Sequence, residues 1–400
     1  MTKSAYIHIP FCKSKCKYCS FVSYTKPDMI TGYIYALLKD ISDNYRGEEL
    51  RTLYFGGGTP SLVPAELLGK VIRKFKFQNN YELTVEVNPD DCTPEYLQAL
   101  IKQGVNRLSI GSQTFDDNIL KLIGRRHNSS DIIRTVEFAK NAGFENISVD
   151  LIYGLPTQTI EKLRQDLDKF LSLEIQHIST YGLKIEEESY WGKIYDKELN
   201  ALKIPDYPLP NLQIFAEAQI VNSPSPPSAD AFRRGVCPLP DDDTQADMYE
   251  GVNEILEQNG FYRYEVSNFA KKGYESKHNL NYWNNDEYYG FGAAAHGYAD
   301  GVRFYNYSEL EKYMATPSTH QYGKTLTEDE KLEEEIFLGF RKREGVNVNK
   351  IKEKFGIDFE NKYRNILEKY SDFIEKTPAG FTLNLKGMLI SNIILADFIE

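Results

Sequence analysis

Three cysteines lie close together near the start of the chain: Cys12, Cys16 and Cys19, in a C-x3-C-x2-C arrangement rich in lysine. Neighbouring lysines favour the thiolate, which is the form of cysteine that binds metals. Three thiolates leave a tetrahedral four-sulfur site one ligand short. Either His8 completes a closed zinc site with them, or they hold an iron–sulfur cluster that leaves one iron open to another ligand. The spacing alone keeps both alternatives open.

The elements expected to position this loop form a repeated strand–helix pattern from residue 5 to about 185. Strands are expected at 5–9, 51–56, 81–87, 106–110, 146–153 and 177–183, and helices at 28–43, 64–76, 94–103, 131–142 and 159–172. Thr93 and Pro94 suit a helix start, and Gly104 and Gly143 suit helix ends. Six such units predict a parallel sheet, and their even spacing favours an α/β fold with a partial (β/α)6 TIM-like barrel.

Polar or glycine-rich segments follow five of the expected strands. They are Cys12–Cys19, Gly56–Pro60, Glu86–Pro89, Gly111–Gln113 and Asp150–Pro156. A single glycine run at a strand end is compatible with an ordinary tight turn. In barrels of this kind, however, ligands bind at the carboxyl ends of the strands. Five such segments at one rim therefore predict a ligand pocket there.

The composition limits the classes of function. The 400 residues include 28 Tyr and 22 Phe. The net charge is −11, and this negative charge argues against non-specific binding to nucleic acid or anionic membranes. Five cysteines, three of them clustered, indicate a metal or redox site in a reducing compartment. No apolar run reaches the ~18 residues of a membrane span, and a strand begins too early for a signal peptide. We therefore expect a cytoplasmic protein.

Four parts are expected along the chain: a barrel domain at 1–197, a Pro-rich insertion at 198–238, a barrel extension at 239–324 and a small domain at 325–400. The insertion is expected to be mobile, with a short helix at 211–222, and Cys237 within it is assigned no metal role. The extension should begin with a helix that follows Asp241–Asp243 and ends near 259. A strand at 262–269 should come next.

The last part is expected to be an α+β, winged-helix-like domain. Its predicted elements are helices at 327–343, 347–355 and 359–370, a hairpin at 373–385 and a final helix from 388. A winged helix suggests DNA, but DNA binding needs a basic face, and this part has 12 basic and 15 acidic residues. A lid or a docking surface for a partner fits the charge better.

A stretch dense in His, Trp, Tyr and Gly lies within the barrel extension. It contains His278-Asn279-x-x-Tyr282-Trp283 and, further on, His296 between small residues. A histidine beside aromatic rings suits an axial ligand of haem iron, with the rings packed on the macrocycle. A buried histidine that is hydrogen-bonded within an aromatic core is the structural alternative. For His296, close backbone packing is expected, and it is the second candidate ligand.

The cysteine loop, with Tyr18 before its last cysteine, is similar to the signature of radical S-adenosylmethionine proteins. The similarity continues through Gly57–Pro60, Glu86–Pro89, Ser109–Gln113, Arg125–Asn128 and Asp150–Pro156. Together these motifs resemble the anaerobic coproporphyrinogen oxidase (HemN-like) superfamily and, within it, the HemW-type haem chaperones. The resemblance covers residues 4 to about 190 and about 239 to the end. It favours the iron–sulfur alternative over zinc.

This resemblance implies a [4Fe–4S] cluster on the three cysteines, with S-adenosylmethionine chelating the fourth iron through its amino and carboxylate groups. It also implies a set of cofactor-binding residues: Tyr6, Tyr18, Gly57, Gly58, Thr59, Glu86, Gln113, Arg125 and Asp150. In this set Glu86 would bond the ribose, and Arg125 would pair with an anionic group, although a surface salt bridge is its structural alternative. His127 would support the cofactor rim.

One position separates the subfamilies. The oxidases have a fourth cysteine two residues after the third, where this chain has Phe21, and they carry an extension before the barrel. Both differences argue against porphyrinogen oxidation and imply a haem chaperone, with no catalytic residue assigned. The alternative is a radical S-adenosylmethionine oxidoreductase of the coproporphyrinogen III dehydrogenase type.

The resemblance implies haem as the cargo and His278, Tyr282 and Trp283 as the haem-binding residues. The implied partner is an acceptor haem protein, membrane-bound or soluble, so the chain would be peripheral at the membrane only while it delivers haem. A homodimer is left open.

Overall fold

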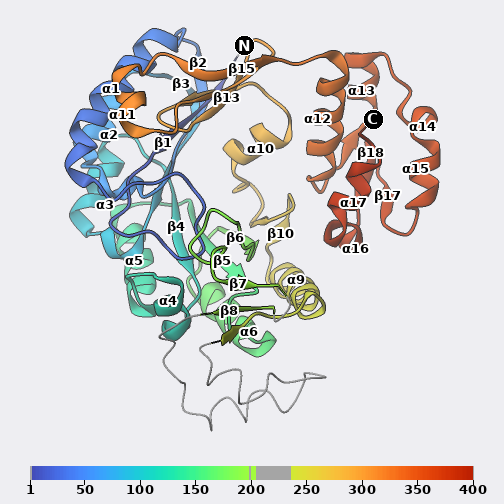
Figure 1. Cartoon of the computed structure of the whole chain (residues 1–400), viewed down its shortest axis with the longest axis horizontal. Coiled ribbons are helices and arrows are strands. Elements are labelled where there is room, and N and C mark those ends of the chain that lie inside the picture. The colour runs from blue at the N-terminus through green and yellow to red at the C-terminus, as the bar shows by residue number, and fades with distance from the viewer. Residues whose placement is uncertain (1, 198–199, 204–235, 400) are drawn as a thin grey trace.

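The structure is a computed structural model, and it describes residues 2–197, 200–203 and 236–399. Its centre is a nine-stranded, mostly parallel sheet in the order β10-β11-β6-β5-β4-β3-β2-β1-β12 (Figure 1). Six of its strands come from the first half of the chain: β1 (Ser4–Ile9), β2 (Glu49–Gly57), β3 (Lys76–Val87), β4 (Arg107–Gln113), β5 (Ile147–Tyr153) and β6 (His177–Gly182). Each pairs in parallel with the next. The predicted partial (β/α)6 barrel is confirmed.

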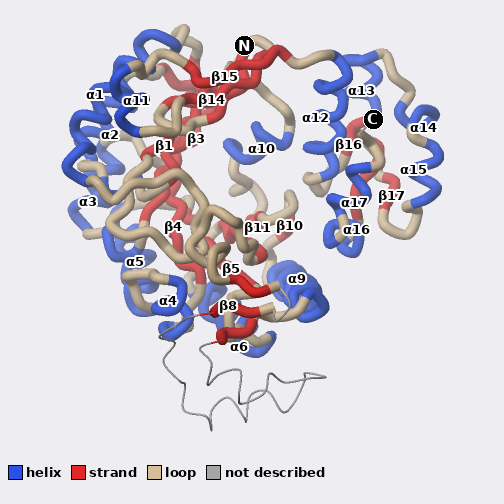
Figure 2. The backbone as a smooth tube through the Cα atoms, viewed as in Figure 1, coloured by secondary structure: helices blue, strands red, loops and turns tan. Residues whose placement is uncertain are grey.

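Helices follow the strands and cover the outer face of the sheet (Figure 2). They are α1 (Ile30–Asn44), α2 (Ala65–Ile72), α3 (Pro94–Lys102), α4 (Asp117–Ile123), α5 (Ser129–Ala142) and α6 (Ile160–Ser172). The predicted start of α3 is confirmed, because the Thr93 hydroxyl accepts the backbone N–H of Tyr96. The short α4 was not predicted; Asp116 caps its start and left-handed Gly124 ends it.

Successive residues of the strands face opposite sides of the sheet, which divides the core from the barrel interior. Ala5, Ile7 and Ile9 of β1 join the hydrophobic core under the helices. The alternate residues Tyr6 and His8 are bonded to each other through Tyr6 Oη and His8 Nδ1, 2.9 Å apart. The polar half of each strand therefore lines the interior.

The segment after residue 238 returns to both edges of the sheet. Helix α9 (Asp242–Gln258) starts as predicted at an Asp241 cap. The strand predicted at 262–269 is wrong, because the chain turns back to form two short antiparallel strands, β10 (Tyr262–Arg263) and β11 (Asn268–Ala270), beside β6. At the other edge, β12 (Tyr289–Phe291) pairs in parallel with β1.

Two further pieces complete this part of the fold. The seven-residue helix α10 (Lys277–Trp283) precedes β12. After β12, a separate antiparallel sheet forms from β13 (His296–Ala299), β14 (Val302–Asn306) and β15 (His320–Thr325), with α11 (Leu310–Ala315) between the last two strands.

The C-terminal part has its own hydrophobic core and lies to one side of the barrel (Figure 1). Its helices are α12 (Glu328–Phe340), α13 (Val348–Phe355), α14 (Phe359–Lys362), α15 (Arg364–Lys369), α16 (Leu385–Leu389) and α17 (Ser391–Ala396). The predicted hairpin is β17 (Ile374–Lys376) and β18 (Gly380–Leu383), which join β16 (Val346–Asn347) in one sheet. The winged-helix-like domain is thus confirmed.

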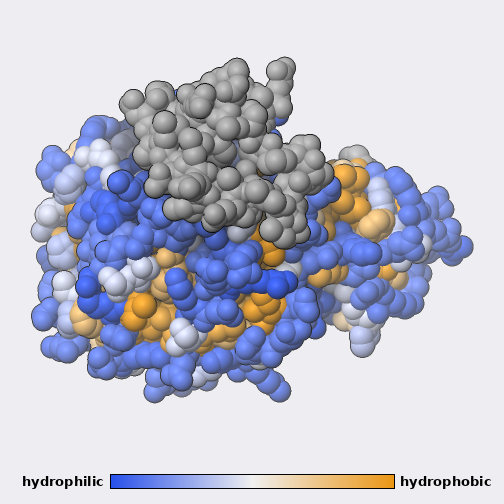
Figure 3. Space-filling model, turned by 90° about the horizontal axis from the view of Figure 1, so that it is seen from below, coloured by the Kyte–Doolittle hydropathy of each residue, from blue (hydrophilic) through white to orange (hydrophobic). Residues whose placement is uncertain are grey.

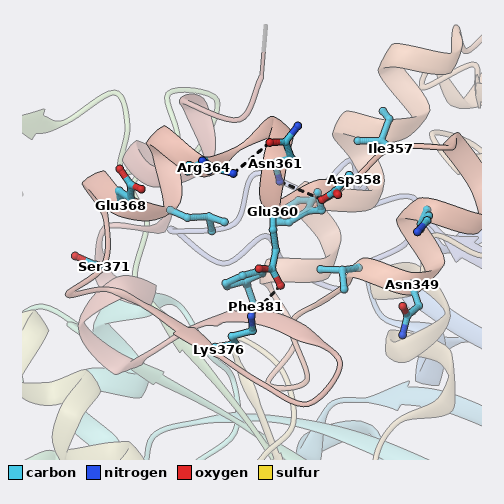
Figure 4. A pocket seen from close by; sticks show the side chains of 14 residues that line it. Asn349, Ile357, Asp358, Glu360, Asn361, Arg364, Glu368, Ser371, Lys376 and Phe381 are labelled. Atoms are coloured by element: carbon cyan, nitrogen blue, oxygen red, sulfur yellow. Dashed lines mark hydrogen bonds and ion pairs between the residues drawn. The ribbon is translucent and has the colours of Figure 1, made fainter.

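Helices α13 to α15 and the hairpin surround an open groove of ≈ 940 Å³ (Figure 4). Two of its charged groups have partners within the domain. Lys376 pairs with Glu360 at 2.9 Å, and Asp358 caps the start of α14. Because both signs occur in the groove, it lacks the basic face that DNA binding needs.

Most of the predicted insertion at 198–238, including the helix expected at 211–222, lies outside the described residues. On either side of it, β7 (Tyr195–Asp196), β8 (Ala201–Lys203) and β9 (Val236–Pro238) form a small antiparallel sheet. Cys237 of β9 is buried within a cluster of apolar side chains.

The face of the molecule seen from below is mainly hydrophilic where the described residues form it (Figure 3). Seen from below, hydrophobic side chains gather only in limited patches among charged and polar ones (Figure 3). Among the described residues, none of the helices has the length and apolar character to pass through a bilayer.

Candidate functional site

The cysteine loop leaves the end of β1 and is tied to its surroundings by backbone hydrogen bonds. The N–H of Cys12 donates to Tyr24 O, and the N–H of Lys17 donates to Ile123 O at the end of α4. Within the loop, the Cys19 N–H donates to Cys16 O at 3.2 Å. All three cysteines are half-buried free thiols. The loop therefore presents its thiols from a fixed backbone.

The three thiols face a cavity of ≈ 150 Å³ at the carboxyl ends of the barrel strands. Every residue predicted for the cluster and the cofactor lines it except Tyr6: Cys12, Cys16, Cys19, Tyr18, Gly57, Gly58, Thr59, Glu86, Gln113, Arg125 and Asp150. Residues from β2 to β5 and the cysteine loop thus meet in one place. We call this the rim pocket.

A chain of hydrogen bonds connects two of the thiols around the rim pocket. Thr59 Oγ1 lies 3.5 Å from Cys12 Sγ and accepts from Asn88 Nδ2 at 3.1 Å. Arg125 donates from Nη2 to Asn88 Oδ1 at 2.7 Å, and its Nη1 lies 3.7 Å from Cys16 Sγ. The Nε of Arg125 is shielded from solvent and has no partner. Arg125 therefore lines the pocket with its Nη1 and Nη2 bonded to neighbouring residues and its Nε buried without a partner among the described residues.

Two carboxyls on the inner face of the barrel complete the pocket. Burial raises the pKa of Glu86 to about 7, although Tyr54 Oη and the Gly57 N–H donate to it at 2.8 and 3.1 Å. Burial also raises the pKa of Asp150 to about 6, against hydrogen bonds from Ser179 and Ser109. Neither carboxyl forms an ion pair with a described residue, so each retains acceptor capacity for a ligand hydroxyl or amine.

The lysines of the cysteine loop stabilise the thiolate form of the cysteines less than the sequence suggested. Burial raises the pKa of Cys19, and the nearby Lys15 only partly offsets this. Lys13 is ion-paired with Asp91 instead. A positively charged group bound in the rim pocket would stabilise the thiolates more directly.

The glycines of the Gly56–Pro60 segment are required by packing against the cysteine strand. A Cβ on Gly57 would lie 2.4 Å from His8 Cε1, and one on Gly58 would lie 2.7 Å from Phe11 O. Gly57 also has a φ of 112°, which disfavours other residues. The segment therefore holds the start of the cysteine loop against the end of β2, in addition to lining the pocket.

His8, the fourth zinc ligand of the closed-site alternative, is occupied elsewhere. Its Nδ1 bonds Tyr6 Oη, and its Nε2 lies 3.0 Å from Val22 O. No three His, Cys, Asp or Glu side chains in the described parts of the chain converge on a single metal ion. Three thiols on a loop beside a polar cavity fit a larger cluster with an open position better than one tetrahedral ion.

The inward-facing side chains below the rim pocket form two further layers. Strand register places Tyr6 beside Tyr54, and Ser4, Thr52 and Glu82 in one row beneath them. Tyr6 and Tyr54 stack with ring centroids 6.2 Å apart. Tyr6 thus lies in the layer below the rim pocket, away from the cavity where it was expected.

Helix α10 closes the bottom of the barrel. His278 Nδ1 bonds Thr52 Oγ1 at 2.8 Å, and His278 Nε2 bonds Tyr282 Oη at 2.8 Å. The ring stacks on Tyr54 at 4.9 Å, and His278 is only 1 % exposed. Burial lowers its pKa to about 3, so the ring is neutral. We call Ser276–Trp283 the barrel plug.

The plug is held by a carboxylate as well. Glu82 accepts the backbone N–H groups of Lys277 and His278, both at 3.0 Å. Ser4 donates to Asn281 Oδ1 at 2.7 Å. Of the predicted haem residues, His278 and Tyr282 are thus bonded to each other, while Trp283, the next residue of α10, is half-buried.

Two further histidines named in the sequence analysis differ in exposure. His127 is buried, with its Nε2 3.2 Å from Ser112 O, so it supports the end of β4 without lining the rim pocket. His296 starts β13 and is exposed.

Sequence reasoning missed Asn88, Ser109 and Tyr54 as parts of the site. Asn88 and Ser109 line the rim pocket. Asn88 directly follows Glu86 and Val87 at the end of β3, so its position in the sequence could have indicated that it lies at the rim pocket. Tyr54 acts through Glu86, and only the alternation along β2 could have indicated that it faces inward.

Comparisons with known proteins agree with this architecture. The profile of the Radical SAM superfamily matches residues 6–170, and that of the HemN C-terminal domain matches residues 326–390. The structure of coproporphyrinogen III oxidase (HemN) from Escherichia coli, titled a radical SAM enzyme, matches with a TM-score of 0.78 at 20 % identity, over 100 % of this chain and 90 % of that one. At this identity the likeness concerns the fold. The chain is a radical SAM protein with a HemN-type C-terminal domain.

Sequence relatives narrow the class. Heme chaperone HemW of Lactococcus lactis subsp. lactis (strain IL1403) is 40 % identical over 367 residues, 90 % of this chain and 87 % of the relative. Heme chaperone HemW of Bacillus subtilis (strain 168) is 36 % identical over 412 residues, 99 % of both chains. This chain belongs to the HemW family of heme chaperones.

Proposed function

We propose that this protein is a haem chaperone that binds haem and transfers it to an acceptor haem protein. In this proposal it carries a [4Fe–4S] cluster and S-adenosylmethionine. The cluster part rests on one observation above all: three free thiols face a cavity that has an unpartnered Arg125 Nε and two carboxyls without ion pairs. The haem part rests on the names of the relatives at 36–40 % identity.

The cluster would be held by Cys12, Cys16 and Cys19, and S-adenosylmethionine would complete it at the open iron. When bound, this pair of cofactors can supply one-electron chemistry. The residues of the chain would bind and orient the cofactor. Arg125 would hold an anionic group, Glu86 would accept from ribose hydroxyls, and Asp150 has acceptor capacity for a further donor.

Tyr18 and Gln113 would border the same ligand, with Gly57, Gly58 and Thr59 near its methionine end. Tyr18 lies with its ring 6.2 Å from that of buried Trp191, which fixes one wall. Tyr6 would act from the layer below, through His8 and Tyr54. Each assignment predicts a loss of cofactor affinity on substitution.

For haem, the proposed region is the motif His278-Asn279-x-x-Tyr282-Trp283. In the described conformation this motif is the barrel plug, so ligation by His278 requires its Nε2 to release Tyr282 and its ring to leave Tyr54. The acceptor is proposed to be a haem protein in the cytoplasm or at the membrane surface.

The second candidate function is a radical SAM oxidoreductase of the coproporphyrinogen III dehydrogenase type. The likeness in fold to HemN favours it. Phe21, at the place of the fourth cysteine of the oxidases, disfavours it. Phe21 is 66 % exposed and borders the rim pocket, so it changes the surface that a substrate would meet.

One set of assays on anaerobically reconstituted protein separates the two functions. The chaperone should bind haem with a defined Soret band and pass it to an apo-haem protein, with no vinyl-bearing product from coproporphyrinogen. Formation of protoporphyrinogen together with 5′-deoxyadenosine would establish the second function instead. A wild-type protein that binds no haem contradicts the chaperone proposal.

A further inference from the structure

Three histidines of the second half of the chain differ in what their rings contact. Both ring nitrogens of His278 are bonded within the barrel plug. His320 Nδ1 bonds Asn306 Oδ1 at 2.7 Å. His296 is exposed, and its ring has no hydrogen-bond partner among the described residues. Partial desolvation lowers the pKa of His296, which favours the neutral imidazole that ligates iron. Among the described residues, His296 and His320 thus each have a ring nitrogen without a hydrogen-bond partner, whereas His278 has none, and only in His296 are both ring nitrogens without one.

His296 belongs to a row of rings on the small sheet. Register places it opposite Tyr305 on β14, and Tyr305 opposite Tyr322 on β15. The centroids of His296 and Tyr305 lie 5.3 Å apart, as do those of Tyr305 and Tyr322, with interplanar angles of 30° and 21°. Tyr322 is 46 % exposed. The three rings form a side-by-side ladder, which we call the ring row.

A flat macrocycle across the ring row would have a favourable geometry. An imidazole ligates haem iron with its ring roughly perpendicular to the porphyrin plane. Tyr305 is tilted by 30° from the imidazole, so its ring would stand steeply on the porphyrin face, close to the edge-to-face arrangement that aromatic pairs favour. The row thus offers one iron ligand and two supporting rings.

The backbone beneath the row is closely packed. A Cβ on Gly290 of β12 would lie 1.9 Å from His296 O, and one on Gly297 would lie 2.2 Å from Phe304 Cζ. This confirms the close packing expected around His296. The packing fixes the backbone that carries His296, which lowers part of the ordering cost of binding.

The ring row lies next to the strand that carries the cysteine loop. β12 pairs with β1, and β13 follows it directly. His296 is near enough to His8 to contribute to the lowering of the pKa of that side chain. His8 in turn packs against Gly57 of the rim pocket. A ligand on the ring row would therefore lie near β12, the strand that pairs with β1.

A cation shares the face of the ring row. Lys324 lies two residues beyond Tyr322 on β15, so it points to the same side, and 48 % of its side chain is exposed. Its partner is Glu330, in a surface ion pair of the kind that is worth little and exchanges readily. Lys324 is thus placed to pair with a carboxylate at the edge of a bound macrocycle, such as a haem propionate.

We propose that the ring row His296–Tyr305–Tyr322 is a haem-binding surface, with His296 as the axial ligand. The inference rests on the proposed haem-chaperone function and specifies where the cargo is held in the described conformation.

The test is a haem titration of the cluster-reconstituted full chain, followed by absorbance and by electron paramagnetic resonance. His296→Gly should weaken haem binding about tenfold or more, a difference of about 1.4 kcal/mol, and abolish the spectrum of an imidazole-ligated iron. Added imidazole should restore that spectrum, which a purely structural role would not predict. His320→Gly, a histidine on the same sheet whose ring is bonded to Asn306, is the matched control and should titrate like wild type.

Two smaller effects should accompany the first. Tyr322→Ala and Lys324→Glu should each weaken haem binding several-fold while they leave the imidazole-ligated spectrum in place. If His296→Gly binds haem with the affinity and spectrum of the wild type, the inference is wrong, whatever the His278 variants do. If the wild type itself binds no haem, the proposed function fails instead.

Discussion

The rim pocket and the barrel plug contain similar side chains at opposite ends of the same strands. Glu86 and Glu82 lie four residues apart on β3 and face the same interior. Glu82 accepts two backbone N–H groups at the start of α10, whereas Glu86 accepts one hydroxyl and one N–H next to an open cavity. The plug uses nearly all its polar groups internally. In the rim pocket, Arg125 Nε has no partner among the described residues, and the thiols of Cys12 and Cys16 accept only the long contacts from Thr59 and Arg125.

This difference shows that density of chemically active residue types does not by itself mark a binding site. The sequence His278-Asn279-x-x-Tyr282-Trp283 is as rich in such residues as the cysteine loop. The two segments differ in their hydrogen bonds. A side chain whose polar atoms are all hydrogen-bonded must lose one of these partners before it can bind a ligand. In the described conformation, the rim pocket therefore has the features of a ligand site, and the plug closes the barrel.

The largest effect should come from the thiols. Cys16→Ala removes one of the proposed cluster ligands, so iron after anaerobic reconstitution should fall from about four atoms per chain towards zero. Cys237→Ala, which changes a buried cysteine assigned no metal role, is the control and should keep its iron. Normal iron content in Cys16→Ala would place the cluster elsewhere.

Substitutions in the barrel plug should lower the free energy of unfolding. His278→Ala leaves a cavity under Tyr54 and removes the partners of Thr52 and Tyr282, so the free energy of unfolding should fall by about 2–4 kcal/mol. His296→Ala, on the exposed sheet, should change it by less than about 0.5 kcal/mol. Urea denaturation of the apo-proteins measures both. Equal small effects would mean that the plug does not hold the barrel closed.

Glu82 and Glu86 should have opposite effects on two quantities, stability and S-adenosylmethionine affinity. Glu82→Gln should lower the free energy of unfolding by about 1–3 kcal/mol, because the amide oxygen is a weaker acceptor at the start of α10. It should leave S-adenosylmethionine affinity unchanged. Glu86→Gln should weaken that affinity by about tenfold, without a comparable loss of stability at pH 7. Equilibrium dialysis and urea denaturation together test this, and a reversal of the two patterns would exchange the proposed roles.

The smallest effect concerns pH. Since burial raises the pKa of Glu86 to about 7, the native state binds more protons than the unfolded state between about pH 4.5 and 7. This group therefore lowers the stability of the apo-protein as the pH rises through that window, by at most about 1.4 kcal/mol per pH unit. Glu86→Gln lacks this contribution, so its stability relative to wild type should increase from pH 5 to pH 8. A pH-independent difference would show that Glu86 titrates normally.

Much of the barrel could be predicted because its signals are local. Alternating strands, caps such as Thr93 and C-terminal glycines such as Gly143 lie within a few residues of the elements they define. The rim pocket could be predicted as well, because in a parallel barrel all carboxyl ends meet at one rim. That Tyr6 lies one layer below the pocket could not be predicted, since the side-chain depth along β1 depends on the register with β2.

The parts that escaped prediction depend on distant pairing. β12 is only three residues long and has no alternation to identify it, yet it extends the main sheet. The burial of His278 follows from contacts with Thr52 and Tyr54, more than 200 residues earlier in the chain. No local pattern contains such information.

The pairing of β1 with β12 has a consequence for the newly made chain. β1 emerges first, but one of its two neighbours in the sheet lies about 280 residues later. At roughly 5–20 residues per second, the ribosome needs on the order of 15–60 s to make that neighbour. During this interval the cysteine loop is attached to a strand with one open edge. The loop that carries Cys12, Cys16 and Cys19 would therefore stay more accessible on the newly made chain than in the finished fold.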